Sequence, residues 1–210
     1  MKTRIVLADN HALVRQGIKS LLERDGFQVV GEAENGQDLV SIAKELQPDV
    51  AVVDIGMPLM NGLIATHELT RACPKVKTIL LTRHDEDQYV IEALRARVRG
   101  YVLKSQVATD LVHAIQQACR GQVYLSPGIS RAVVDAYLTK SSVPDDPLSA
   151  REHEVLQLVA EGKSTKDVAS LLGISVKTAE SHRSRLMQKL DIHEVAGLVR
   201  YAVRKGLVQA

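Results

Sequence analysis

Four polar residues stand directly after short apolar segments, and their types suit phosphoryl chemistry. They are Asp9 after residues 4–8, Asp54 after residues 50–53, Thr82 after residues 78–81 and Lys104 after residues 101–103. Two neighbouring carboxylates repel each other and favour a divalent cation such as Mg²⁺, which prefers oxygen ligands. A carboxylate beside such a metal can attack a phosphoryl donor and form an aspartyl phosphate, while an ammonium and a hydroxyl contact the phosphoryl oxygens. Asp54 alone is better explained as the cap of the following turn or helix, and any two of the four could be unrelated polar residues at strand ends, so only the four together indicate chemistry.

These side chains can cooperate only if one edge of a sheet brings the strand ends together. Strand and helix patterns alternate five times between residues 4 and 120, which is typical of a parallel sheet covered by helices on both faces. The run Val50–Val53 lacks polar alternation and predicts a strand buried on both faces, while Pro58 and Gly62 exclude a regular element directly after it. In the flavodoxin-like strand order 2-1-3-4-5, the first and third strands are neighbours, which would place Asp9 beside Asp54.

The composition is typical of a folded protein with two small domains, and it narrows the possible functions. Of the 210 residues, 45% are hydrophobic and 25% are charged, without a long apolar run or a charged-then-apolar leader, so we expect a cytoplasmic protein with no membrane partner. Cys73 and Cys119 lie far apart and outside any CxxC pattern, which argues against a disulfide framework or a zinc site. One Phe and no Trp argue against a stacking platform for single-stranded nucleic acid.

The strand-end residues lie within motifs that resemble the receiver domain of bacterial response regulators. The matching motifs are Ala-Asp-Asn-His at 8–11, Asp-Ile-Gly-Met-Pro at 54–58 with Gly62, Leu-Thr at 81–82 and Gly-Tyr-Val-Leu-Lys at 100–104. This resemblance implies that Asp54 is the phosphoacceptor, in a Mg²⁺ site formed by Asp9, Asn10, Asp54 and the backbone carbonyl of Gly56. It also implies that Thr82 is the switch hydroxyl, that Tyr101 changes rotamer with it, and that Lys104 pairs with the phosphate.

Three residues depart from the usual receiver pattern. Most receivers carry a second acid where this chain has Asn10, so one negative charge is missing and the Mg²⁺ affinity should fall. Arg83 follows Thr82 where many receivers have a small or apolar residue, and it would either crowd the site or help to bind phosphate. Arg97 stands where related chains often have Gly, which would cost about 1 kcal/mol of stability if the backbone there is left-handed.

The rest of the chain predicts a linker and a small helical domain. We expect the receiver at residues 1–121, a linker with an extra helix at 129–138 over residues 122–147, and a second domain at 148–210. This second domain carries 10 Lys and Arg against 7 Asp and Glu, a basic excess that the first 147 residues lack. Its helices are expected at residues 150–161, which Ser149 and Glu152 begin with a capping box, and at residues 164–172, 176–190 and 193–205.

The third of these helices has an apolar face and a polar face suited to DNA. Ala179, Leu186 and Leu190 are expected to pack inward, and a short turn containing Gly173 precedes the helix, which suggests a helix-turn-helix. Polar side chains on the opposite face could reach phosphates and base edges in a major groove; the candidates are Lys177, Thr178, Glu180, Ser181, Arg183, Ser184 and Arg185. By periodicity alone, a solvated polar face on a helical bundle explains the pattern almost equally well.

The sequence of this domain resembles the LuxR-type helix-turn-helix. The matching strings are Leu-Ser-Ala-Arg-Glu-His-Glu-Val-Leu at 148–156, Ala-Glu-Gly-Lys-Ser-Thr-Lys-Asp-Val-Ala at 160–169 and Ile-Ser-Val-Lys-Thr-Ala-Glu-Ser-His-Arg-Ser-Arg-Leu-Met-Gln-Lys-Leu at 174–190. The whole chain therefore resembles a NarL/FixJ-type response regulator, with an α/β flavodoxin-like (βα)5 receiver followed by an all-α helix-turn-helix domain.

This second resemblance implies the partners of the protein. A sensor histidine kinase would phosphorylate Asp54, and the protein would bind double-stranded promoter DNA as a homodimer, with RNA polymerase as a further partner. The last helix would form the dimer contact on DNA through Val195, Leu198 and Val199.

Three other interpretations stay open. Asn10 and Arg83 are compatible with a pseudo-receiver, in a DNA-binding regulator that works without phosphorylation. An aspartate-nucleophile phosphatase shares the strand-end Asp54, but it usually needs a second carboxylate two residues later, where this chain has Gly56. An autoinducer receptor shares the C-terminal domain but needs a ligand-binding N-terminal domain. We therefore expect a regulator rather than an enzyme.

Overall fold

The computed structural model describes residues 2–83, 87–127, 129, 147–204 and 207–208. The chain divides into two compact units, Met1–Ser141 and Ser142–Ala210. The extra helix expected at residues 129–138 lies outside the described residues apart from Ile129, as does most of the expected linker. Within the described ranges, no helix has the length and apolar character needed to cross a membrane.

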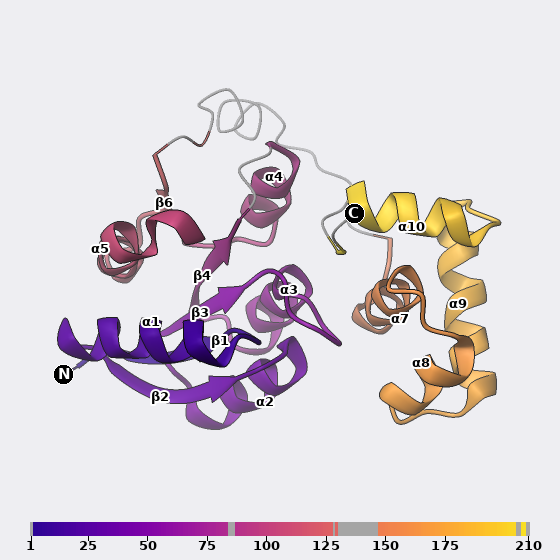
Figure 1. Cartoon of the computed structure of the whole chain (residues 1–210), viewed down its shortest axis with the longest axis horizontal. Helices are drawn as coiled ribbons and strands as arrows, with labels where there is room; N and C mark the ends of the chain where they lie inside the picture. The colour runs from indigo at the N-terminus through magenta and orange to yellow at the C-terminus, as the bar shows by residue number, and fades with distance from the viewer. Residues whose placement is uncertain (1, 84–86, 128, 130–146, 205–206, 209–210) are drawn as a thin grey trace. The chain divides into compact units, whose positions relative to one another are not determined.

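The N-terminal unit is a six-stranded parallel sheet with the order β2-β1-β3-β4-β5-β6 (Figure 1). The strands are β1 Arg4–Ala8, β2 Gln28–Ala33, β3 Val50–Asp54, β4 Lys77–Thr82, β5 Gly100–Leu103 and β6 Tyr124–Leu125. The helices are α1 Ala12–Arg24, α2 Gly36–Leu46, α3 Gly62–Ala72, α4 Asp87–Arg95 and α5 Val107–Cys119, and a 3-10 turn spans Lys104–Gln106. The order of the first five strands confirms the flavodoxin-like fold.

Helices cover both faces of this sheet, and the central strands are therefore apolar on both sides. Side chains at alternate strand positions form one core with α1 and α5; its members include Ile5, Leu7, Val50, Val52, Ile79, Leu81, Ile18, Leu22, Leu111 and Ile115. The intervening strand residues, such as Val6 and Val53, point to the opposite face by the two-residue period of a strand, and that face carries α2 and α3 (Figure 1). Every residue of β3 is buried, as its unbroken apolar run predicts.

A sixth strand, β6, was not expected from the sequence. Tyr101 of β5 pairs with Leu125, and the Ser126 amide donates to the Tyr101 carbonyl oxygen at 3.0 Å. The Ser126 hydroxyl donates to the Asp110 carboxylate at 2.7 Å and accepts from the Leu103 amide at 3.2 Å. The start of the expected linker is thus anchored to the strand that ends at Lys104.

Hydrogen bonds near β6 determine whether the buried Asp110 carboxyl group is ionised. Burial alone would raise the pKa of Asp110, but hydrogen bonds from Ser126, Thr109 and Tyr124 outweigh burial and hold that pKa below its usual value. Burial and the neighbouring Asp110 raise the pKa of Tyr124 to about 12. Near neutral pH, Asp110 is therefore a carboxylate that accepts hydrogen bonds from neutral hydroxyls.

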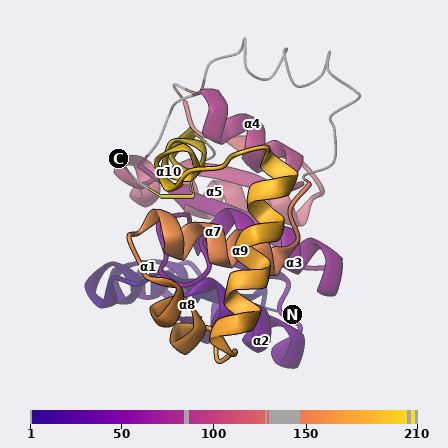
Figure 2. The same cartoon turned by 90° about the vertical axis from the view of Figure 1, so that its right-hand side faces the viewer.

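The C-terminal unit consists of four helices in the residues that the structure describes. They are α7 Ala150–Ala160, α8 Thr165–Leu171, α9 Val176–Leu190 and α10 Val195–Arg204. Figures 1 and 2 show α8 and α10 at opposite ends of the long α9, and α7 packs against all three. The capping box of Ser149 and Glu152 is present as predicted, and a second box joins Ser164 and Asp167 at the start of α8. Gly173, with φ of +63°, makes the turn between α8 and α9.

Candidate functional site

Asp9 and Asp54 lie side by side at the carboxyl edge of the sheet, joined by Lys104. Ala8 pairs with Val53 in the β1–β3 register, so the next residue on each strand is one of these two acids. The Lys104 ammonium lies 2.8 Å from Asp9 Oδ2 and 2.8 Å from Asp54 Oδ2, and both carboxylates are buried. The three groups together carry one net negative charge in a water-poor site, an oxygen-rich arrangement that fits a divalent cation.

The loop after β3 holds Asp54 in place through close backbone contacts. A Cβ atom at Gly62 would overlap the Asp54 carbonyl oxygen, and the Gly62 amide donates to the Ile55 carbonyl at 3.0 Å. The Asn61 side chain then caps α3 by accepting from the Ile64 amide at 2.9 Å. Gly62 is therefore required because the first turn of α3 lies directly against the backbone of Asp54.

The other expected receiver residues lie around this pair at different depths. Thr82 and Tyr101 are buried on β4 and β5, and the Gly56 amide donates to Asp54 Oδ1 at 3.2 Å. Asn10 is exposed directly after Asp9. Arg83 is also exposed, and with Lys104 it lines an open groove of about 830 Å³ beside α1 and the start of α5.

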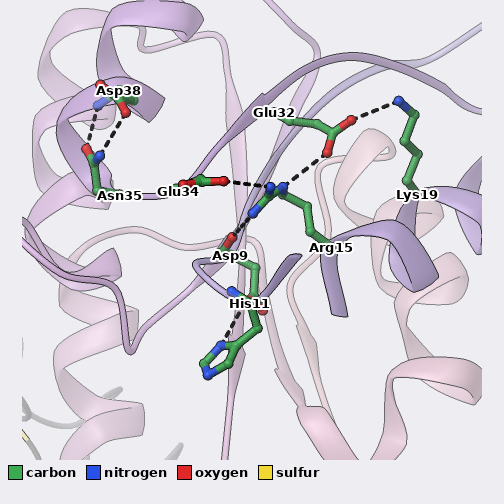
Figure 3. A network of polar contacts seen from close by, with 8 residues as sticks. All are labelled: Asp9, His11, Arg15, Lys19, Glu32, Glu34, Asn35 and Asp38. Atoms are coloured by element: carbon green, nitrogen blue, oxygen red, sulfur yellow. Dashed lines mark hydrogen bonds and ion pairs between the residues drawn. The ribbon is translucent and has the colours of Figure 1, made fainter. Parts of the chain in front are cut away.

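Two further residues at this edge, His11 and Arg15, were not predicted from the sequence. The His11 amide donates to Asp9 Oδ1 at 2.8 Å, and His11 Nδ1 lies 3.1 Å from the same oxygen. Arg15 donates to the Asp9 backbone carbonyl at 2.6 Å, to Glu32 at 3.1 Å and to Glu34 at 2.9 Å (Figure 3). The Asp-x-His spacing was a usable signal for His11, whereas the partners of Arg15 depend on where β2 ends in space.

A second candidate site lies on α9, which has one face in the core of its domain and an opposite face exposed to solvent. Ala179 and Leu186 are fully buried as predicted, and Leu190 is half-buried. Of the seven candidate DNA-binding residues, six are exposed: Lys177, Thr178, Glu180, Ser181, Ser184 and Arg185. The seventh, Arg183, is half-buried, and its guanidinium lies 3.3 Å from the Thr165 hydroxyl at the start of α8. The exposed set forms the polar face expected of a recognition helix.

One expectation for the last helix is wrong. Leu198 is 0% exposed and belongs to the core of its own domain, in which α10 packs against α7, so it is unavailable to a second subunit. Val195 is 42% exposed and Val199 is half-buried, so these two can still contact a partner. An apolar residue at helical spacing indicates a buried face, but it does not tell whether the burying surface is internal or belongs to a partner.

Comparison with known sequences identifies both units. The family described as the response regulator receiver domain matches residues 5–116, and the family described as bacterial regulatory proteins of the luxR family matches residues 146–202. The transcriptional regulatory protein MctR of Rhizobium johnstonii is 36% identical over 208 residues, covering 99% of this chain and 96% of MctR. The oxygen regulatory protein NreC of Staphylococcus carnosus is 36% identical over 214 residues, covering 98% of this chain and 99% of NreC.

Solved structures give the same result for the fold and the domain order. RcsB of Salmonella typhimurium superposes with a TM-score of 0.60 at 28% identity, over 95% of this chain and 98% of RcsB. RcsB of Salmonella enterica serovar Typhimurium, bound to a promoter in the presence of a phosphomimetic, gives 0.58 at 29% identity, over 96% and 98%. Because both domains match in order, this chain belongs to the NarL/FixJ-type response regulators, a family of DNA-binding transcription factors that are not enzymes.

Proposed function

We propose that a sensor histidine kinase phosphorylates Asp54, and that the phosphorylated protein dimerises and binds promoter DNA in the cytoplasm. The observation that carries this proposal is the cluster of Asp9, Asp54 and Lys104, with one ammonium 2.8 Å from both buried carboxylates. A structural ion pair needs only one acid, whereas phosphoryl transfer needs a nucleophile, a metal ligand and a cation that can follow the phosphoryl group.

The residues of the cluster have separate roles in this reaction. The Gly56 amide, donating to Asp54 Oδ1, holds the carboxylate in one orientation. An Asp54 oxygen attacks the phosphorus of the donor phosphohistidine, the new oxygen–phosphorus bond forms as the phosphorus–nitrogen bond breaks, and the imidazole leaves with the electron pair and is protonated. Lys104 pairs with the phosphoryl oxygens, and Thr82 donates to one of them. Asp9, Asp54, Asn10 and the Gly56 carbonyl would hold Mg²⁺, which would supply positive charge against the phosphoryl oxygens.

The proposal is tested by incubating the purified protein with Mg²⁺ and acetyl phosphate and measuring its intact mass. We expect one phosphoryl adduct in the parent and none in Asp54→Ala, which removes the nucleophile but leaves Lys104 paired with Asp9. If the parent forms no adduct while it stays folded and binds DNA, the chain is a regulator with a pseudo-receiver, the alternative that Asn10 favours.

For the second unit, we propose that α9 enters the major groove and that α10 supplies the dimer contact through Val195 and Val199. The exposed polar face of α9 supports the first part, and the exposed fraction of Val195 supports the second. The promoter-bound structure of RcsB supports DNA as the partner of this domain. RNA polymerase would be contacted from the DNA-bound dimer.

A further inference from the structure

We propose that the groove between α1 and the start of α5 binds a small organic carboxylate with an apolar body, such as a medium-chain fatty acid. The groove has a volume of about 830 Å³, within the range of about 300–1,000 Å³ that is usual for sites of small organic ligands. Asp54 is not one of the described residues that line it. The inference therefore goes beyond the proposed phosphorylation and does not depend on it.

The two walls of the groove are apolar. Val14, Ile18 and Leu21 recur at helical spacing along α1, and Val107 and Ala108 begin α5 on the other side. Ile18 is buried in the core of the unit, but Val14 is 38% exposed and Ala108 is exposed as well. Apolar surface is thus left to solvent inside a concave site, and a ligand with an apolar body would be stabilised by covering it.

Gly17 widens the groove without a structural need for glycine at that position. It lies in the middle of α1, where glycine is less stable than alanine. A Cβ atom at Gly17 would meet no atom within 4 Å outside its own part of the helix, so close packing does not require glycine. Because Gly17 lines the groove between Val14 and Leu21, the missing side chain leaves room for a ligand against the backbone of α1.

The charged residues of the groove are all cationic. They are Arg24, Arg83 and Lys104, and no Asp or Glu is among the lining residues that the structure describes. The Lys104 ammonium already lies 2.8 Å from each of two carboxylates, which neutralise much of its charge. Such a lining favours an anionic ligand over a neutral or cationic one.

Arg83 is the residue that we expect to bind the carboxylate. Its side chain is exposed, whereas Arg24 already contacts Asp25 at 3.8 Å and is the last residue of α1, about 15 Å along the helix from Val14. A guanidinium matches a carboxylate with two parallel N–H donors. With the carboxylate at Arg83, the apolar body would lie over Val14 and Gly17.

The test titrates the full-length protein with decanoate below its micelle concentration, followed by calorimetry. Decylammonium has the same chain with the opposite charge, and acetate has the same carboxylate without the apolar body. We expect decanoate to bind at least about tenfold more tightly than either of them, because only decanoate matches both the cations and the apolar walls.

Two pairs of variants locate the ligand in the groove. Gly17→Leu fills the space beside α1 and should raise the decanoate Kd at least about tenfold, whereas Gln16→Leu adds the same side chain at the next exposed position and should leave the Kd unchanged. Arg83→Gln should raise the Kd at least about threefold, and Arg71→Gln, at a largely exposed position on α3, should not. Circular dichroism checks that each variant is folded.

Equal Kd values for Gly17→Leu and Gln16→Leu would overturn the inference, as would equal binding of decanoate and decylammonium. Acetate bound as tightly as decanoate would show an anion site without an apolar pocket and would also overturn it. If decanoate does not bind and Gly17→Leu instead changes the sedimentation mass, the groove is an interface between two copies of the chain. If decanoate does not bind and Gly17→Leu slows only phosphoryl transfer from a kinase, the groove belongs to the kinase contact. The Asp54 adduct tests the proposed function separately, whatever decanoate does.

Discussion

At the scale of single residues, Arg15 holds the backbone of Asp9 through the Asp9 carbonyl oxygen. Its guanidinium joins the Asp9 carbonyl to two acids at the end of β2, and the hydrogen bond from Lys19, with that from Arg15, holds the pKa of Glu32 below its usual value despite burial (Figure 3). Arg15→Met should lower the free energy of unfolding by about 1–3 kcal/mol, because it leaves a buried carbonyl and Glu32 with fewer donors.

The same substitution should also raise the Mg²⁺ concentration needed for half-maximal labelling of Asp54, since the backbone of Asp9 is then less fixed. Arg24→Met is the control, because Arg24 lies on the same helix with a largely exposed side chain. Equal effects of the two substitutions on the Mg²⁺ dependence would show that Arg15 contributes stability alone.

A second residue-scale prediction concerns the buried Glu152 of α7. Burial alone would raise its pKa, but hydrogen bonds from Lys189 and Ser149 outweigh burial and hold the pKa below the usual 4.5. Because the pKa of Glu152 is lower in the folded state, the ionised carboxylate stabilises the fold above pH 4.5. This contribution is lost as the pH falls through the lowered pKa. Lys189→Met should therefore cost about 1–2 kcal/mol at pH 7 and progressively less below pH 4.5, measured by urea unfolding.

The exposed Lys166 of α8 provides the control for this pair, because Lys166→Met removes one positive charge from the same unit away from Glu152. A cost of Lys189→Met that stays constant from pH 7 to the acid range would mean that weaker packing, and not the ion pair, explains the effect.

At the scale of the elements, the backbone between α4 and β5 gives a prediction that the sequence had already suggested. Arg97 is exposed and has φ of +59°, so the backbone there is left-handed and the condition for the expected cost is met. Arg97→Gly should raise the free energy of unfolding by about 0.5–1 kcal/mol, because the strain relieved exceeds the extra entropy of Gly in the unfolded chain. Urea unfolding measures the change, and Arg97→Ala, which stays strained, should bring no gain.

The helices and strands also explain which parts of the site could be predicted from the sequence. Alternating strands and helices determine that Asp9, Asp54 and Lys104 meet at one edge, because parallel strands carry their carboxyl ends together. The strand β6 has only two residues and depends on pairing with β5, so no local sequence pattern predicts it. The contacts of Arg15 with Glu32 and Glu34 likewise depend on a register that shifts between Ile5 and Val6.

Substitutions on the exposed face of α9 should distinguish contacts that recognise particular base pairs from contacts that bind any DNA. If Lys177 contacts a phosphate as proposed, Lys177→Ala should weaken binding to specific and random DNA alike and reduce the salt dependence. If Glu180 and Ser184 bind base edges as proposed, Glu180→Ala and Ser184→Ala should each change the discrimination between base pairs by about 1–3 kcal/mol. Fluorescence anisotropy at several salt concentrations measures both effects, and equal weakening on both kinds of DNA for Glu180→Ala would exclude base recognition by that residue.

At the scale of the whole molecule, the segment that follows α5 is attached to the sheet next to the phosphoacceptor site. Tyr101 on β5 pairs with β6, and the Ser126 hydroxyl contacts both Asp110 and the amide of Leu103, the residue before Lys104. A shift of Lys104 on phosphoryl binding would therefore act on the strand to which β6 and Ser126 are attached.

The corresponding prediction concerns the geometry of the DNA site. A dimer that places two copies of α9 in successive major grooves needs half-sites whose centres are about 10 bp apart, or a multiple of that spacing. With the receiver phosphorylated, insertion of about 5 bp should weaken binding at least tenfold, because the half-sites then face opposite sides of the duplex, and a further 5 bp should restore part of the affinity. Asp54→Ala should show little dependence on spacing, and Val195→Asp should lose that dependence even when phosphorylated. Equal affinity at all spacings for the phosphorylated parent would mean that the two copies bind DNA independently.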